Sequence, residues 1–237
     1  MVFKVVGHRG NPSQYPENTI ASFVSALKCG SSGVETDIQI TRDKEIVIFH
    51  DDDMKRLTGE PGMIGQYTLA ELKEMRVLGT DEAIPTLQEF LDSTNGIERF
   101  IELKARNEKG ERINTGLEKY LNSFFHDDYT RDIHFISFDI EAIRNMKEYN
   151  RNYSVGLDIG RETSLIWDSM MKDHIPDFLD FVIPEYSIIE NEDRDLGRNS
   201  SRIIPWVVNE PEKLETLKKK GIDAFMTDIP CLMAGYA

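Results

Sequence analysis

The chain has 237 residues, of which 40% are hydrophobic and 30% charged, so it can form a sizeable core and is not a disordered chain. Its formal net charge is −14, and an acidic surface repels phosphate backbones and anionic headgroups. These properties exclude nucleic acid and stable membrane association from the expected partners, and they leave the oligomeric state unknown. An anionic substrate would need local positive charge, for which a bound metal ion is the first candidate.

The first residues, Met1–Val6, form a short apolar run that ends at Gly7. They lack the basic start, long apolar middle and small-residue cleavage site of a signal peptide. No apolar stretch approaches the roughly 20 residues that cross a bilayer. The simplest expectation is a cytoplasmic protein.

Short β-rich runs alternate with amphipathic stretches, and no linker or low-complexity tract divides the chain. The predicted strands are Lys4–His8, Val34–Ile38 (with Ile46–His50 as a possible addition), Arg99–Leu103, Ile133–Phe138, Tyr153–Leu157, Phe178–Ile183, Arg202–Val208 and Ala224–Thr227. The predicted helices cover Asn18–Leu27, a start at Thr86–Leu91, Ile113–Phe124, Asp139–Tyr149 and a last helix that Pro211 opens. For residues 184–199, which are acidic and irregular, the pattern does not settle whether a helix forms.

Strands that alternate with helices predict an α/β fold with a parallel sheet, and at this length a closed (β/α)8 TIM barrel. We expect residues 1–237 to form a single domain. The stretch 51–79 is too long for an ordinary connection, so we interpret it as a small insertion after the second strand, over the top of the barrel. Cys29 and Cys231 are expected at opposite barrel ends, hence unbridged, and free thiols indicate a reducing compartment.

Acidic side chains recur at alternate positions in two of the predicted strands. Glu35 and Asp37 lie two residues apart and therefore face the same side, as do Glu102 and Lys104. Unpaired carboxylates facing the helices would be very costly, so we expect them at the barrel mouth. Carboxylate oxygens with water suit Mg²⁺ or Ca²⁺ better than Zn²⁺. The alternative is a buried network of ion pairs without metal.

Two histidines end β-rich runs beside a charged residue. His8 precedes Arg9, and His50 precedes Asp51. Histidine titrates close to neutral pH, so each can take a proton from a nucleophile or give one to a leaving alkoxide. We interpret the remaining histidines as ordinary surface or packing residues: His126, His134 and His174.

Three further features each have two interpretations. Arg9 can grip a phosphate group through two hydrogen bonds, or it can form a salt bridge with a metal-site carboxylate or with Glu17. Trp206 is either part of the core or a wall for the organic part of a substrate. The run Pro16–Thr19 is interpreted as a helix start in which Asn18 or a neighbour caps the helix.

At these residues the sequence resembles the glycerophosphodiester phosphodiesterase family. The similar segments, in order and over nearly the whole chain, are Gly7-His8-Arg9-Gly10, Pro16-Glu17-Asn18-Thr19, Ser22-Phe23 with Ala26, Gly33-Val34-Glu35-Thr36-Asp37, Thr41-Arg42-Asp43, Val47-Ile48-Phe49-His50-Asp51, Thr58-Gly59, Ile84-Pro85-Thr86-Leu87, Ile101-Glu102-Leu103-Lys104, Ser137-Phe138, Trp206-Val207-Val208-Asn209 and Thr227-Asp228-Ile229-Pro230. A single His-Arg-Gly triplet would be a weak signal, whereas the ordered set is a strong one. Val207 departs from the family pattern, which often has Thr there, and residues 184–199 carry no family signature.

The resemblance implies metal-dependent hydrolysis of small glycerophosphodiesters to glycerol 3-phosphate and an alcohol, in a (β/α)8 barrel with a small insertion after the second strand. It implies the following roles: Glu35, Asp37 and Glu102 bind one divalent cation, Mg²⁺ or Ca²⁺; His8 and His50 are the acid–base pair; Arg9 and Lys104 bind phosphate; Phe138 and Trp206 lie near the glycerol.

Other functions remain open beside this one. A related phosphodiesterase could act on a lysophospholipid, in the manner of lysophospholipase D, or stop at a cyclic phosphate. The sequence shows no obvious apolar or basic segment for lipid docking, which favours a soluble substrate. A catalytically silent barrel is the alternative from another class, and the presence of both histidines and all the acidic residues counts against it.

Overall fold

The computed structural model describes residues 2–107, 109–125 and 130–237, and its centre is a curved parallel sheet. The parallel strands pair in the order β7-β6-β5-β4-β2-β1-β8. Their bounds are β1 Lys4–Gly7, β2 Gly33–Ile40, β4 Glu98–Leu103, β5 Ile133–Ser137, β6 Ser154–Ile159, β7 Phe181–Pro184 and β8 Ala224–Thr227. The short strand β3 (Ile46–Ile48) pairs antiparallel with β2 and lies outside this order.

The segment 203–208 closes the sheet between β7 and β8. On one side, the amide of Ile204 donates to the carbonyl of Val182 at 3.0 Å. On the other side, the amide of Val208 donates to the carbonyl of Met226, and Met226 donates to Pro205, each at 2.9 Å. These bonds close the sheet into a ring, which confirms the expected TIM-barrel-like fold. The strand expected at Arg202–Val208 is not continuous: Arg202 ends the 3₁₀ helix Gly197–Arg202, and the segment pairs with β7 only through isolated bridges at Ile203 and Trp206.

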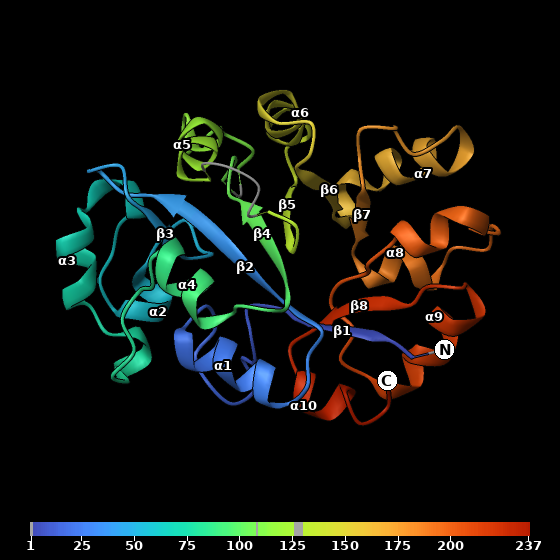
Figure 1. Ribbon diagram of the computed structural model, residues 1–237, viewed down its shortest axis with the longest axis horizontal. Helices are drawn as coiled ribbons and strands as arrows, with labels where there is room; N and C mark the ends of the chain where they lie inside the picture. Colours follow the sequence, from blue (N-terminus) through green and yellow to red (C-terminus); the bar gives the residue numbers. More distant parts are fainter. Residues whose placement is uncertain (1, 108, 126–129) are drawn as a thin grey trace.

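Helices surround the strands on the outside (Figure 1). The α-helices are α1 Ile20–Lys28, α2 Lys55–Thr58, α3 Leu69–Glu74, α4 Leu87–Ser93, α5 Leu117–Phe124, α6 Ile140–Tyr149, α7 Ser164–Lys172, α8 Tyr186–Glu190, α9 Leu214–Lys219 and α10 Pro230–Met233. Short 3₁₀ helices are η1 Ile64–Gln66, η2 Val77–Gly79, η3 Arg161–Thr163, η4 Gly197–Arg202 and η5 Pro211–Lys213. In the stretch 184–199, whose structure the sequence left open, α8 forms. Within the described residues, no helix combines the length and the apolar character that a membrane crossing requires.

The core has an inner and an outer layer because strand side chains alternate. The outer layer packs the strands against the helices. The inner layer fills the barrel with Val6, Phe100, Ile136, Ile183, Ile204, Ala224 and Met226. Two positions beyond Val6, Phe100 and Met226, towards the carboxyl ends, the chain has His8, Glu102 and Asp228. The apolar interior therefore ends beneath a polar layer at the mouth.

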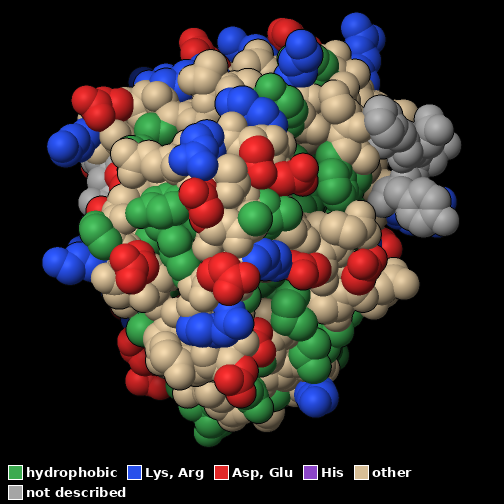
Figure 2. Space-filling view, turned by 90° about the vertical axis from the view of Figure 1, so that its left-hand side faces the viewer, with side chains coloured by type: hydrophobic (Ala, Val, Ile, Leu, Met, Phe, Trp, Pro, Cys, Tyr) green, Lys and Arg blue, Asp and Glu red, His purple; other side chains and the backbone are tan. Residues whose placement is uncertain are grey.

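Residues 51–86 form a separate small cluster beside β3. Here α2, η1, α3 and η2 pack around Val47, Phe49, Met54, Leu57, Ile64, Leu72, Val77 and Ile84. On the face that carries α3, positive and negative side chains are interspersed (Figure 2), and the ion pairs Arg42–Glu71 and Lys73–Glu89 join neighbouring elements there. The description of 51–79 as an insertion within one domain stays a prediction.

The expectation that the two cysteines stay apart is wrong. Cys29 and Cys231 form a disulfide, with their Cα atoms 4.8 Å apart. Because β8 pairs with β1, α10 lies beside α1. The side-chain nitrogen Nδ2 of Asn11 contacts both helices, with Ser25 Oγ of α1 at 2.9 Å and Cys231 Sγ of α10 at 3.2 Å. The expectation rested only on the end of the barrel at which each cysteine should lie. It did not consider that α1 and α10 are neighbours around the barrel. The expectation of a reducing, cytoplasmic compartment therefore loses the support that free thiols gave it.

We predict that replacing both cysteines, in the Cys29→Ser/Cys231→Ser variant, lowers the free energy of unfolding by about 2–5 kcal/mol, because the disulfide closes a long loop and restricts the unfolded chain. Urea unfolding of the oxidised wild type and of the variant measures the difference. Two titratable thiols in the native, unreduced wild type would contradict the disulfide itself.

Candidate active site

The turn after β1 is shaped by tight backbone contacts. Gly10 has φ 87°, and a Cβ on it would lie 2.5 Å from Ser22 Oγ, so no larger residue fits. Arg9 also has a positive φ, 54°, which is uncommon for a non-glycine residue. Its amide donates to Glu35 Oε2 at 2.9 Å, and its carbonyl accepts from Ser22 Oγ at 2.9 Å. The turn is thereby tied to β2 and α1, which directs the residues after β1 towards the mouth.

Three buried carboxylates form the centre of the mouth. Glu35, Asp37 and Glu102 each offer an oxygen, and these oxygens lie within 4.8 Å of one another. The register of the sheet explains the meeting, because Asp37 on β2 is the partner of Glu102 on β4. Asp37 Oδ1 is buried and has no hydrogen-bond partner among the described residues.

The electrostatics of this cluster suit a cation. Burial and the charge of Asp37 raise the pKa of Glu35, and burial likewise raises the pKa of Glu102. Against the effect of burial, the charges of His50 and Arg9 hold the pKa of Asp37 well below its ordinary range. Carboxylates so close repel one another, and a hard divalent cation that prefers oxygen ligands would relieve this repulsion. It could also bind Asp37 Oδ1, which has no hydrogen-bond partner among the described residues. The three side chains therefore fit the expected metal site.

Two positive side chains border the carboxylates. Lys104 Nζ lies 3.1 Å from Glu102 and 3.6 Å from Asp37, and Arg9 Nε lies 3.5 Å from Asp37. Arg9 Nη1 also binds Glu17 at 2.7 Å. Both salt bridges that we set against a phosphate role for Arg9 are thus present. They hold its guanidinium at the mouth, where it lines the cavity.

Both predicted catalytic histidines are oriented in the same way. His8 Nδ1 lies 2.7 Å from Asp228 Oδ1, and His50 Nδ1 lies 2.9 Å from Asp51 Oδ1. A carboxylate at Nδ1 favours the proton on that nitrogen and leaves Nε2 as the nitrogen that faces the site. His8 Nε2 lies 3.9 Å from Glu35, beside the carboxylate cluster.

The two carboxylate partners are themselves held in the charged form. Burial tends to raise the pKa of Asp228, but the hydrogen bond and charge of His8, together with the hydrogen bond from Asn209, outweigh it, so the pKa falls below its usual value. Hydrogen bonds from His50 and Arg56 likewise hold the pKa of Asp51 far below its usual range, against partial burial. Each histidine therefore has an anionic partner at neutral pH, which would stabilise it as an imidazolium during proton transfer.

Aromatic rings form one wall of the mouth. Phe138 and Trp206 pack edge to face with ring centroids 5.8 Å apart, and Trp206 stacks beside His8 at 6.3 Å. The Trp206 indole nitrogen donates to the carbonyl of Ile183 at 2.9 Å, which fixes the ring. Phe138 remains 37% exposed, so its face is available to a ligand.

The predicted site residues all meet at this mouth. A cavity of about 80 Å³ is lined by His8, Arg9, Glu35, His50, Glu102, Ile136, Phe138, Asp158, Trp206 and Met226. A wider hollow of about 360 Å³ shares His50, Glu102 and Phe138 with it and adds Lys104. Asp37 completes the carboxylate cluster between β2 and β4. None of the predicted site residues lies elsewhere in the described chain, although their roles stay predictions.

Several site residues were missed from the sequence. Asn18 donates to Asp37 Oδ2 at 2.8 Å, while its neighbour Thr19 caps α1 by accepting from the amide of Ser22, so the run Pro16–Thr19 serves both the helix and the site. Asp158 on β6 lies two residues after Gly156, and strand alternation alone could have placed it at the mouth.

A second group of possible ligands was also missed. Glu17, His50 and Asp51 offer atoms within 4.8 Å of one another. Both carboxylates are already hydrogen-bonded by Arg56, with the contacts to Glu17 at 2.7 and 2.9 Å and to Asp51 at 2.6 and 2.8 Å. We therefore assign the expected metal to the buried cluster and interpret this group as a support for His50.

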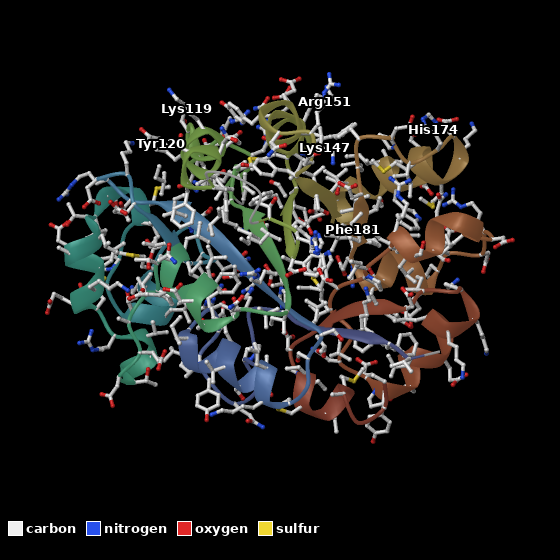
Figure 3. The ribbon with its side chains drawn as sticks, in the orientation of Figure 1. Lys119, Tyr120, Lys147, Arg151, His174 and Phe181 are labelled. Carbon is white, nitrogen blue, oxygen red and sulfur yellow. A yellow bond between two sulfur atoms is a disulfide. The ribbon has the colours of Figure 1, made fainter. Side chains whose placement is uncertain are left out.

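The other histidines lie away from the mouth. His134 is buried between Phe100 and Phe181, with ring centroids 4.6 and 5.0 Å away, and forms an ion pair with Glu98. It is thus a packing residue, as we expected. His174 is exposed beyond α7, at the outer edge of the molecule (Figure 3). His126 lies outside the described residues.

The fold and the position of these side chains define a barrel enzyme of the (β/α)8 class, with its site at the carboxyl ends of the strands. The sequence model of the glycerophosphoryl diester phosphodiesterase family matches residues 8–232, and the chain belongs to this family. A glycerophosphodiester phosphodiesterase of Caldanaerobacter subterraneus subsp. tengcongensis is 27% identical over 236 residues, which cover 95% of this chain and 94% of that protein.

Solved structures show the same fold. A phosphodiesterase of Oleispira antarctica, in complex with the product sn-glycerol-3-phosphate, aligns with a TM-score of 0.78 at 24% identity and covers 99% of this chain and 96% of its own. A glycerophosphodiester phosphodiesterase of Thermotoga maritima also aligns with a TM-score of 0.78 at 24% identity, covering 100% of this chain and 99% of its own.

We predict that Mg²⁺ or Ca²⁺ at a hundredfold excess over its Kd raises the Tm of EDTA-treated protein by about 5–10 °C, because the ion binds only the folded carboxylate cluster. Differential scanning fluorimetry measures the shift. The Glu35→Gln variant should lose most of it, whereas the matched control Glu215→Gln, at an exposed position of α9, should keep it. A shift of equal size in both variants would place the cation elsewhere.

Proposed function

We propose that this protein is a divalent-metal-dependent phosphodiesterase that hydrolyses glycerophosphodiesters to glycerol 3-phosphate and an alcohol. The observation that carries the proposal is the meeting of three buried carboxylates with two carboxylate-held histidines at one barrel mouth. Family membership supports it, as does the related Oleispira antarctica enzyme, whose product is sn-glycerol-3-phosphate.

The proposed metal ligands are Glu35, Asp37 and Glu102, with Mg²⁺ or Ca²⁺ as the ion, since all three donors are hard oxygen atoms. When bound, such an ion stabilises negative charge on phosphate oxygens as a Lewis acid. Lys104 and Arg9 are proposed to bind the remaining phosphate oxygens. Both lie within 4 Å of the carboxylate cluster, so a phosphate placed there is met by positive charge from two sides.

His8 and His50 are proposed to exchange the two protons of the reaction through Nε2. One takes the proton of the attacking hydroxyl, and the other gives a proton to the departing alkoxide. Asp228 and Asp51 hold the rings and stabilise the charged form of each. The two environments are so alike that either assignment of acid and base fits them.

The attacking group is proposed to be the 2-hydroxyl of the substrate's own glycerol. Its oxygen forms a bond to phosphorus, the bond from phosphorus to the alcohol oxygen breaks, and the alcohol leaves with the proton from the acidic histidine. Water then opens the resulting cyclic phosphate to give glycerol 3-phosphate. Direct attack by water is the alternative. Phe138 and Trp206 are proposed to pack beside the glycerol carbons, since their rings form the apolar wall of the cavity.

We predict that the purified protein releases glycerol 3-phosphate from glycerophosphocholine, that EDTA abolishes release, and that Mg²⁺, Ca²⁺ or Mn²⁺ restores it. An enzymatic assay for glycerol 3-phosphate measures the product, and phosphorus NMR separates it from a cyclic phosphate. Absence of product from glycerophosphocholine, glycerophosphoethanolamine, glycerophosphoinositol and glycerophosphoglycerol with every metal would contradict the proposal.

We predict that His50→Ala lowers kcat by about 10²–10⁴-fold, because the variant loses one general acid or base. Substrate affinity should change little, since the metal-binding carboxylates and the phosphate-binding Arg9 and Lys104 remain. Steady-state kinetics test this, with His174→Ala as the matched control, because His174 is exposed and distant from the mouth. Near-full turnover in His50→Ala would rule out its proposed role.

A further inference from the structure

Asp158 is the carboxyl that strand β6 contributes to the mouth of the barrel. Two residues earlier on the same strand face, a Cβ on Gly156 would touch Ile136 and Ile183 of the inner apolar layer. Alternation therefore points the Asp158 side chain into the barrel, one level above that layer. It lines the cavity of about 80 Å³ together with Phe138 and Trp206.

Asp158 differs from Asp51 and Asp228 because no hydrogen bond or ion pair to it is found in the described structure. Only 6% of it is exposed, and its Oδ2 is buried without a hydrogen bond. Asp51 and Asp228, by contrast, each bind a histidine and a second donor. An unpartnered buried carboxyl is costly, so its presence in a cavity points to a donor that a ligand supplies.

Asp158 does not belong to the carboxylate cluster. The cluster's oxygens lie within 4.8 Å of one another, and Asp158 is not among the residues that supply them. β6 is separated from β4, which carries Glu102, by β5, so the two strands are about 10 Å apart. Phe138 follows β5 between them. Asp158 therefore faces the aromatic, organic side of the cavity.

The chemistry of the ligand group follows from this position. A phosphate oxygen is a poor partner for a carboxylate, which repels it, and the cations that would bind the phosphate form ion pairs with Asp37 on β2. A hydroxyl is a suitable donor, and a carboxyl keeps an acceptor oxygen in either protonation state. The smaller cavity, of about 80 Å³, suits the glycerol that all these diesters share, whereas the wider hollow beside Lys104, of about 360 Å³, suits the variable alcohol.

We propose that Asp158 accepts a hydrogen bond from the terminal hydroxyl of the substrate's glycerol and so makes the site selective for glycerol over a deoxy analogue. The inference rests on the proposed function, in which the phosphate lies at the carboxylate cluster and the 2-hydroxyl lies beside phosphorus. The terminal hydroxyl is then the glycerol donor that lies farthest from phosphorus, towards β6.

Two phosphate monoesters that differ by one oxygen test the proposal. Calorimetry on the metal-loaded protein compares sn-glycerol 3-phosphate with the matching enantiomer of propane-1,2-diol 1-phosphate, which lacks only the terminal hydroxyl. We predict that the wild type binds the deoxy ligand about tenfold or more weakly, as expected for a hydrogen bond to a carboxyl group. Asp158→Leu should bind the two ligands within about twofold of each other. Asp158→Asn keeps an acceptor oxygen and should retain most of the preference.

Each other outcome overturns the inference in a recognisable way. If Asp158→Leu keeps the wild-type preference, or if the wild type shows none, Asp158 does not bind the terminal hydroxyl, although hydrolysis of glycerophosphodiesters still stands. If Asp158→Leu weakens both ligands equally and also weakens Mg²⁺ or Ca²⁺ binding, Asp158 serves the metal cluster. If the wild type hydrolyses no glycerophosphodiester, the proposed function fails and the inference fails with it.

Discussion

The pairing of β2 with β4 is the constraint on which the rest of the mouth depends. It sets Asp37 opposite Glu102, and strand alternation adds Glu35 on the same face, so three carboxylates meet inside the barrel. This concentration of negative charge would destabilise the fold if nothing balanced it. Positive and hydrogen-bonding side chains around the carboxylates offset part of this charge: Lys104, Arg9 and the side-chain amide of Asn18. The proposed divalent cation would supply the charge that these neighbours leave uncompensated.

Charge balance also connects the barrel with residues beyond its strands. Arg9 reaches from the cluster to Glu17, Glu17 binds Arg56 in α2, and Arg56 binds Asp51, which holds His50. The contacts thus run from Arg9, beside the carboxylate cluster, to the proposed catalytic ring of His50 through three ionic side chains. Arg9, Glu17 and Asp51 are partly buried, whereas Arg56 is exposed, so the Arg9–Glu17 pair is screened less than a pair on an open surface. Orientation of His50 and placement of Arg9 are therefore coupled features of one network.

The fold was predictable because each barrel strand can be identified from a short run of neighbouring residues in the sequence. Apolar runs that end in His8 or in Thr227-Asp228 mark both a strand and its position at the mouth, and i, i+2 carboxylates mark a common face. The disulfide and the Arg56–Glu17 pair were not predictable, because they join residues whose proximity depends on how helices lie side by side. Asp158 falls between these cases. Alternation in β6 could have placed it at the mouth, although it was not among the predicted site residues, and only the structure shows that its Oδ2 lacks a hydrogen bond.

The two histidines illustrate how similar local geometry can have different structural origins. Asp228, the partner of His8, directly follows β8 and is braced by Asn209, so the closed barrel itself fixes it. Asp51, the partner of His50, depends on Arg56, which belongs to the small cluster of residues 51–86. That cluster has its own apolar contacts and can therefore vary without disturbing the barrel interior. Changes in this segment should thus affect the reaction through His50, whereas His8 should respond to the packing of β8 against β1.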